Sequence, residues 1–240
     1  MIESPLLLEE PDDSTAPAIT TGKLRLARLA VSLAFLINGA GFAFWVSRIP
    51  TIRHQLHLSD TQLGLTLFGL AIGALIGFPL SGLGCARYGS KATMLVFGFG
   101  YCITLALIPF ANSQLMLALA LTLFGICHGG MDVAMNENGV AVEHLYGRSI
   151  MSSLHGTYSL GNLLGASVGL VLVGRISTES HLIGGAAFLV LILFLVGRTM
   201  LYTKPTHKHD QPTFAIPSRS LIAVGMVITC AFLCEGAMGD

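Results

Sequence analysis

Seven apolar segments run through this chain of 240 residues, and each is long enough to cross a lipid bilayer as a helix. A bilayer core of ~30 Å needs about 20 helical residues at ~1.5 Å per residue. The predicted spans are 26–48, 61–84, 91–111, 114–142, 150–174, 181–203 and 219–240. A soluble domain of this length has no core large enough to bury so many apolar helices. We therefore predict an all-α membrane protein whose main partner is the lipid bilayer.

The composition agrees with this prediction and excludes other classes. Hydrophobic residues make up 53% of the chain and charged residues 11%, against about 25% charged in a typical soluble domain. Thirteen basic and thirteen acidic side chains cancel, so nucleic acid is not an expected partner. The five cysteines are scattered without metal-ligand spacing. We expect neither a metal nor a cofactor.

The distribution of basic residues predicts the orientation. If the N-terminus is cytoplasmic, ten basic residues lie inside: Lys23, Arg25, Arg28, Arg87, Lys91, Arg148, Arg198, Lys204, Lys208 and Arg219. Only Arg48, Arg53 and Arg175 then lie outside. Because cytoplasmic loops are enriched in Lys and Arg, we expect a multi-pass protein of the cell membrane, in a bacterium the inner membrane, with its N-terminus inside.

Two of the predicted helices carry glycine at every fourth position. The rows are Gly69, Gly73 and Gly77 in segment 61–84, and Gly161, Gly165 and Gly169 in segment 150–174. Gly69 and Gly161 are 92 residues apart, and Gly41 and Gly130 are 89 residues apart. Such rows let helices pack closely in lipid. The matched intervals also predict two three-helix repeats of inverted topology, as in many secondary transporters.

One face of segment 114–142 and its extension is polar. His128, Asp132, Asn136, Gly139 and Glu143 follow one another in steps of three and four residues. An acid within a membrane span is costly unless it faces a cavity or a partner. The stripe is explained either by a wet pathway for a solute or a proton, or by a buried hydrogen-bond network. We favour the pathway.

Two other segments present polar faces that complement this stripe. In segment 150–174 the face consists of His155, Tyr158, Ser159 and Asn162, and histidine is the side chain that changes charge near neutral pH. In segment 26–48 Asn38, Gly41, Trp45 and Arg48 lie along one side.

Two residues of that side leave alternatives open. Trp45 is interpreted either as a ligand-stacking residue or as a member of the interfacial aromatic belt, with the belt favoured. For Arg48 we expect that its side chain reaches to the interface or caps a partner group.

A short loop is predicted between the second and third segments, on the cytoplasmic side. It runs from Gly82 to Lys91 and contains Arg87 and Gly89. Glycines permit a tight turn there. The loop resembles the signature of the major facilitator superfamily, roughly G-x-L-A-D-R-x-G-R-K, which Gly82, Arg87, Gly89 and Lys91 match. Ala86 and Ser90 replace an acidic and a basic residue of that signature.

Further motifs resemble an uncharacterised bacterial branch of that family near the fucose permeases. They are Trp45–Pro50, Asp132–Asn136, Ile150–Gly156 and Glu235–Asp240. The resemblance implies two six-helix bundles around a central cavity that opens alternately to each side. It further implies that Asp132 and Asn136 serve solute or proton coupling, together with His155 and Tyr158, and it draws attention to Glu235. The helix 1 acid of proton-coupled sugar carriers has no match.

The expected organisation follows from this resemblance. Residues 1–25 form a disordered tail, 26–203 the first bundle, 204–218 a linker, and 219–240 the first helix of a truncated second bundle. The expected function is secondary transport of a small polar solute, sugar-like and proton-coupled, which needs the missing C-terminal bundle. The alternatives are a seven-helix receptor or sensor and a non-transporting fragment. No HExxH or GxSxG motif is present, so we do not expect an enzyme.

Overall fold

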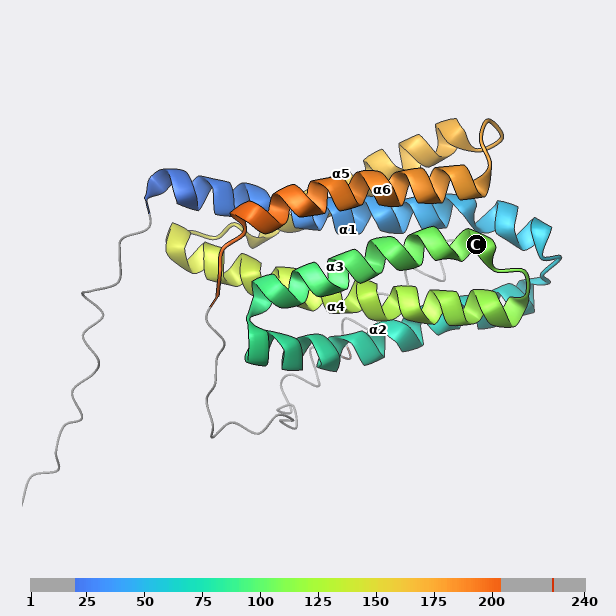
Figure 1. The fold of residues 1–240 in the computed structure, drawn as a ribbon, viewed down its shortest axis with the longest axis horizontal. Coiled ribbons are helices and arrows are strands. Elements are labelled where there is room, and N and C mark those ends of the chain that lie inside the picture. Colours follow the sequence, from blue (N-terminus) through green and yellow to red (C-terminus); the bar gives the residue numbers. More distant parts are fainter. Residues whose placement is uncertain (1–19, 204–225, 227–240) are drawn as a thin grey trace, which may run out of the picture. The chain divides into compact units, whose positions relative to one another are not determined.

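The computed structural model describes residues 20–203 and residue 226. Residues 20–203 form six α-helices and one short 3-10 helix (Figure 1). They are α1 (Thr21–Gln55), α2 (Asp60–Tyr88), α3 (Ser90–Leu107), η2 (Ile108–Phe110), α4 (Gln114–Tyr146), α5 (Met151–Leu172) and α6 (Thr178–Thr199). The all-α prediction is confirmed. The predicted linker and seventh helix, with Glu235, lie outside the described residues except for Met226.

The first helix extends beyond its predicted ends. It begins at Thr21 rather than residue 26, because Lys23, Leu24 and Arg25 are good helix formers. At its other end it passes through Pro50 and continues to Gln55, although proline gives up one backbone hydrogen bond. Of the predicted tail, residues 1–19 lie outside the described part of the chain.

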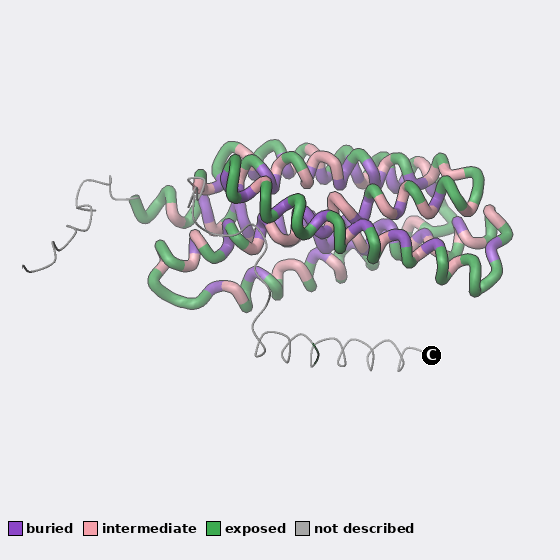
Figure 2. Tube along the Cα trace, turned by 90° about the horizontal axis from the view of Figure 1, so that it is seen from below, coloured by how far each residue is buried: buried purple, intermediate pink, exposed green. Residues whose placement is uncertain are grey.

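Five of these helices are long and apolar enough to cross a membrane: α1, α2, α3 with η2, α4 and α6. The remaining helix, α5, has 22 residues. The mean hydropathy of its most apolar stretch is lower than that of the other five because its first half carries the polar face that includes His155 and Asn162. The sides of the helices that face one another are buried, and their outer sides are exposed (Figure 2). Large apolar side chains such as Leu75 and Leu115 lie on these exposed sides, as expected for surfaces that contact lipid.

The helices pair across the two predicted repeats. The second helix of the first unit, α2, packs along α4, which is the first helix of the second unit. In the same way α5, the second helix of the second unit, packs along α1, the first helix of the first unit. In addition α3 contacts α6, and α1 contacts α4. This exchange of partners is the arrangement that two related three-helix units produce.

Glycine rows line both of these paired contacts. On α2, Gly69 lies against the carbonyl of Ala118 and Gly73 against that of Thr122, while Gly77 lies against that of Ile126. A Cβ at any of these three positions would collide with the α4 backbone. The rows therefore allow the helix backbones to approach more closely than any larger residue permits.

The equivalent row on α5 makes the same kind of contact with α1. Gly161 lies against the backbone of Leu36, Gly165 against that of Ala40, and Gly169 against the side chain of Ser47. The close approach fixes the distance between α5 and α1, and with it the position of the polar face of α5.

The predicted loop Gly82–Lys91 is wrong in extent. Helix α2 continues to Tyr88 and α3 begins at Ser90, so Gly89 alone makes the turn. Its φ of 84° lies in the region that only glycine adopts without strain. Gly82 lies inside α2 and makes no turn. One left-handed residue reverses the chain here, and the flanking residues keep their helical hydrogen bonds.

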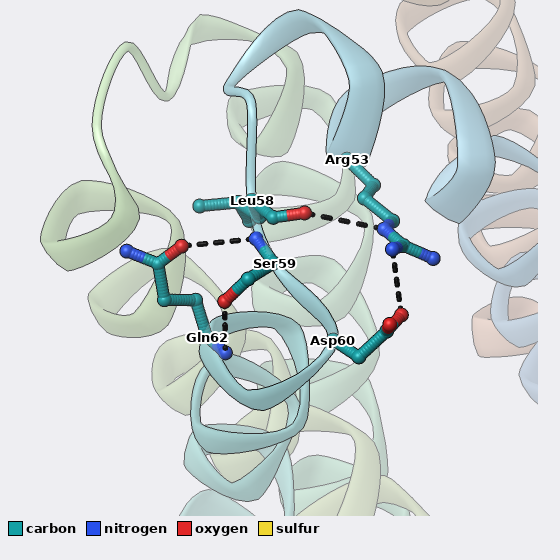
Figure 3. Close-up of polar contacts among 5 residues, drawn as sticks. All are labelled: Arg53, Leu58, Ser59, Asp60 and Gln62. Carbon is teal, nitrogen blue, oxygen red and sulfur yellow. Dashed lines mark hydrogen bonds and ion pairs between the residues drawn. The ribbon is translucent and has the colours of Figure 1, made fainter.

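The turn between α1 and α2 is held by local polar contacts (Figure 3). Ser59 caps α2 by accepting a hydrogen bond from the backbone N–H of Gln62, and the Gln62 side chain accepts one from the N–H of Ser59. Arg53 donates to the carbonyl of Leu58 and pairs with Asp60 at 2.6 Å. Because the Asp60 side chain is 87% exposed, this ion pair contributes only about 0–1 kcal/mol. The capping box is the more important of the two contacts.

Candidate functional site

Asp132 lies beyond the middle of α4, half-buried, with Asn136 one turn further along. The Nδ2 atom of Asn136 donates to Oδ1 of Asp132 at 3.2 Å and to the Asp132 carbonyl at 2.9 Å. Both contacts lie within one helix. The carboxylate is therefore oriented by its own helix, and within residues 20–203 it has no hydrogen-bond partner on a neighbouring one.

His128, one turn before Asp132, lies among aromatic rings. It is stacked on Phe42 of α1 at 5.1 Å between ring centroids, and it lies 5.6 Å from the Tyr101 ring and 6.3 Å from the Phe124 ring. Its Nδ1 atom is buried and has no hydrogen-bond partner among the described residues. This histidine is packed by aromatic side chains, with one polar atom left free.

Asn38 of α1 is fully buried beside this histidine. Its Nδ2 atom lies 3.5 Å from the backbone carbonyl of His128. The backbone carbonyl of Asn38 accepts a 2.7 Å hydrogen bond from the Tyr101 hydroxyl. Within residues 20–203 the Oδ1 atom of Asn38 has no partner. Asn38, Tyr101 and His128 thus join α1, α3 and α4 in one polar contact with unused hydrogen-bonding capacity.

Sequence reasoning missed Tyr101 and Phe42. Both lie in apolar helices, and neither stands in a polar stripe. The one available signal for Tyr101 was a hydroxyl within the predicted span 91–111, since a buried tyrosine hydroxyl generally has a hydrogen-bond partner.

The polar face of α5 lies toward the same region. His155 is exposed, and its ring contacts Phe35 of α1 edge-on at 5.3 Å. Gly39 of α1, next to Asn38, lies against the backbone of Tyr158 and Asn162, so α1 joins this face of α5 to the His128 region of α4. Half-buried Asn162 donates from Nδ2 to the carbonyl of Tyr158 at 3.5 Å. The polar faces of α4 and α5 therefore contribute to one region.

A groove with a volume of about 730 Å³ opens between α1 and α5 next to this region. Phe42, Ser47 and Asn162 line it together with apolar side chains. Phe42 thus contacts both the groove and His128. Among the described residues, no three His, Cys, Asp or Glu side chains come together as metal ligands.

Trp45 is not an interfacial belt residue in the structure. It is 1% exposed and belongs to the core between the helices. The favoured belt interpretation is wrong because the side of α1 that carries Trp45 packs against other helices. Arg48 is also 1% exposed. It caps the backbone carbonyls of Leu172, the last residue of α5, and of Ile176, which was one of its two expected roles, and it does not reach to the interface.

Glu143 departs from the polar stripe to which the spacing assigned it. Its carboxylate accepts hydrogen bonds from the backbone N–H groups of Ile150 at 2.6 Å and Met151 at 2.9 Å. It also accepts one from the Ser149 hydroxyl at 3.3 Å. Gly139, next on the stripe, packs against Leu154 and Met151. The end of the stripe therefore holds the start of α5 in place.

The junction between α2 and α3 contacts the segment that follows α6. The backbone N–H and the hydroxyl of Ser90 contact the Thr203 hydroxyl at 2.9 and 2.8 Å. Buried Asn138 donates to Ser90 Oγ and to the carbonyl of Leu201. Arg87 is exposed and lies over the Tyr88 ring, and Lys91 is half-buried. The signature motif around Gly89 thus borders a buried polar cluster that joins the start of α3, α4 and the segment after α6.

The helices, the lipid-compatible surface and the internal polar region define a multi-pass α-helical membrane protein. The model of the Major Facilitator Superfamily matches residues 31–238. The chain belongs to this family.

Known relatives agree with this assignment. An uncharacterised MFS-type transporter of Yersinia pestis is 34% identical over 213 residues, covering 89% of this chain and 56% of that protein. A hexuronate transporter of Bacillus subtilis is 28% identical over 149 residues, covering 62% of this chain and 35% of that protein. The relatives are transporters and not enzymes.

A solved structure shows the same fold. The crystal structure of the nucleoside transporter NupG superimposes with a TM-score of 0.68 at 14% identity, covering 78% of this chain and 47% of that one. At this identity the similarity concerns the fold alone. The chain spans about half the length of the curated relatives it matches first, 56% of the Yersinia protein.

Proposed function

We propose that this chain contributes the N-terminal six-helix bundle, 26–203, of a secondary transporter that moves a small polar solute by alternating access. The observation that carries the proposal is that α1 contacts polar residues of both α4 and α5, His128 through Asn38 and Asn162 through Gly39, beside an open groove. Asp132 and Asn136 are half-buried on α4 and His155 is exposed on α5, within helices whose outer sides are apolar. Ionisable groups at membrane depth generally serve solute or ion movement because their desolvation is costly.

The proposed roles follow from the chemistry of each side chain. Asp132 binds a proton or a solute hydroxyl, and Asn136 keeps its carboxylate oriented. His155 presents a ring nitrogen to the solute. Tyr158 and Asn162 offer further hydrogen bonds, and the buried group of Asn38, Tyr101 and His128 supports the site from behind. Trp45 supports the site from the helix core.

The proposed solute is hydroxylated and of the size of a monosaccharide. The support is a site rich in carboxylate, amide and imidazole groups beside aromatic Phe42, a combination that recognises polar rings with hydrophobic faces. The hexuronate and nucleoside transporters among the similar proteins carry solutes of this kind. Proton coupling through Asp132, as symport, is part of the proposal.

The proposal also covers the orientation of the chain in the membrane and its need for a second bundle. The N-terminus lies in the cytoplasm, and the motif Gly82, Arg87, Gly89 and Lys91 lies on that side. A linker at 204–218 leads to the first helix of a second bundle at 219–240. Transport requires that second bundle, because the relatives are about twice as long and the site described here forms only one wall of a cavity.

A ligand screen tests the proposal. The complete protein, purified in detergent, is heated with sugars, hexuronates, nucleosides and, as controls, amino acids and apolar drugs. Radiolabelled uptake into cells then follows for each compound that raises the melting temperature. We expect at least one hydroxylated solute to raise the melting temperature and to accumulate in cells. Uptake confined to apolar compounds would contradict the proposed site. Full uptake by residues 1–240 alone would contradict the need for a second bundle.

A further inference from the structure

The end of α1 holds a buried arginine that reaches three other parts of the chain. The Nε atom of Arg48 donates to Nδ1 of His181, in the first turn of α6, at 2.8 Å. Its Nη1 atom donates to the carbonyl of Ile176 at 3.3 Å, and its Nη2 atom to that of Leu172, the last residue of α5, at 3.4 Å. One side chain therefore ties α1 to the end of α5, to the connecting segment and to α6.

This geometry determines the protonation state of His181. An arginine side chain has donors and no acceptor, and it stays charged in proteins. The Nδ1 atom of His181 must therefore keep its lone pair, and the ring proton lies on Nε2. That Nε2 atom is buried without a partner among the described residues, as is Oγ1 of Thr178 one turn earlier. A proton on Nδ1 and the bond from Arg48 exclude each other.

The surroundings offer little to compensate a second positive charge. From α1, the Phe44 ring lies 5.2 Å from the imidazole, and from α5 the near residue is Gly169. The η2 turn, which contacts α6, brings only Ile108, Pro109 and Phe110. Glu179, in the first turn of α6, does not pair with Arg48 at salt-bridge distance within the described residues. Arg175 in the connecting segment is exposed.

We propose that Arg48 and His181 form a proton-operated latch between α1 and the α5–α6 end of the bundle. When His181 is neutral, Arg48 is bound and its guanidinium holds the carbonyls of Leu172 and Ile176 at the end of α5 and just after it. When acid protonates Nδ1, the bond from Nε is lost and two like charges face each other. Arg48 then leaves the imidazole and releases the end of α5. The latch is distinct from the Asp132 region and requires no solute, so it stands apart from the proposed transport function.

Hydrogen–deuterium exchange tests the latch directly. The full chain in lipid nanodiscs is labelled at about pH 8 and at about pH 5, on either side of the usual histidine range. Exchange of peptides covering 169–182 is then corrected for the pH dependence of the chemical rate. We expect the corrected exchange of these peptides to be several-fold faster at the lower pH, while peptides from the α2–α4 contact stay unchanged.

Three variants make the result decisive. His181→Asn places an amide oxygen near the position of Nδ1, where it accepts the Arg48 bond without titrating, so exchange is expected to be slow at both pH values. His54→Asn changes an exposed histidine of α1 and is expected to behave like the wild type. A wild type without the pH effect, or His181→Asn with the full effect, would overturn the latch. In Arg48→Met, the peptides covering 169–182 should exchange fast at both pH values. If this variant fails to fold, His181→Asn still decides.

Discussion

Asn136 and Asp132 form a side-chain pair within a single turn of α4, with Nδ2 of Asn136 lying 3.2 Å from Oδ1 of Asp132. Asn138, two residues further on, behaves differently, because it donates to Ser90 Oγ at 3.0 Å and to the carbonyl of Leu201 at 2.9 Å. One asparagine orients a carboxylate of its own helix. The other joins α4 to α3 and to the segment after α6.

This contrast predicts different effects of the same substitution. Asn138→Ala leaves Ser90 and the Leu201 carbonyl with one partner fewer in a buried place, and is expected to cost about 1–3 kcal/mol. Asn136→Ala removes contacts within one helix at a half-buried position, and is expected to change stability by less than about 1 kcal/mol. Thermal unfolding in detergent, followed by circular dichroism, measures both. Equal melting temperatures for the two variants would contradict the bridging role of Asn138.

The glycine contact between α2 and α4 gives a second prediction. A Cβ on Gly73 would collide with the carbonyl of Thr122, and a backbone atom cannot move aside cheaply. Gly73→Ala is therefore expected to destabilise the bundle by about 1–3 kcal/mol. Gly64→Ala, on the same helix, has no atom within 4 Å of the new Cβ and should gain up to about 1 kcal/mol from helix propensity. Melting temperatures that move in the same direction would argue against this contact.

The carboxylate of Glu143 supports the start of α5. Glu143→Ala leaves the N–H groups of Ile150 and Met151 without their acceptor, and is expected to cost about 0.5–2 kcal/mol, like the loss of a helix cap. Glu143→Gln keeps an acceptor oxygen and should lose about half as much, since bonds to a charged acceptor are roughly twice as strong as neutral ones. The matched control is Glu137→Ala, an exposed acid on the same helix. If Glu137→Ala lowered the melting temperature as far as Glu143→Ala, the capping role would be refuted.

The length of each apolar run was sufficient to predict the six helices, because the bilayer fixes how many residues a span requires. Helix ends were harder to predict. The first predicted span ended at residue 48, yet α1 passes through Pro50 and continues to Gln55. The glycines at 82 and 89 looked alike in the sequence, but only Gly89 has a positive φ.

The polar residues of α4 and α5 were found by their helical spacing, which needs no knowledge of neighbours. Their partners could not be found in that way. Tyr101 joins the region only because α3 places its hydroxyl against the Asn38 carbonyl. Arg48 had two open roles until the packing of α6 placed His181 beside it. Glu143 continued the stripe in spacing, yet the left-handed turn at Gly147 brings the start of α5 back onto it.

The most direct test of the account is the pH dependence of solute uptake by the complete protein carrying Asp132→Asn. The amide keeps the size of the side chain and its hydrogen bond with Asn136, but it cannot take up a proton. With insertion in the membrane verified, we predict that uptake driven by a proton gradient is lost, while Glu137→Gln retains the activity and pH profile of the wild type. Uptake by Asp132→Asn with an unchanged dependence on the proton gradient would contradict the central role of this carboxylate.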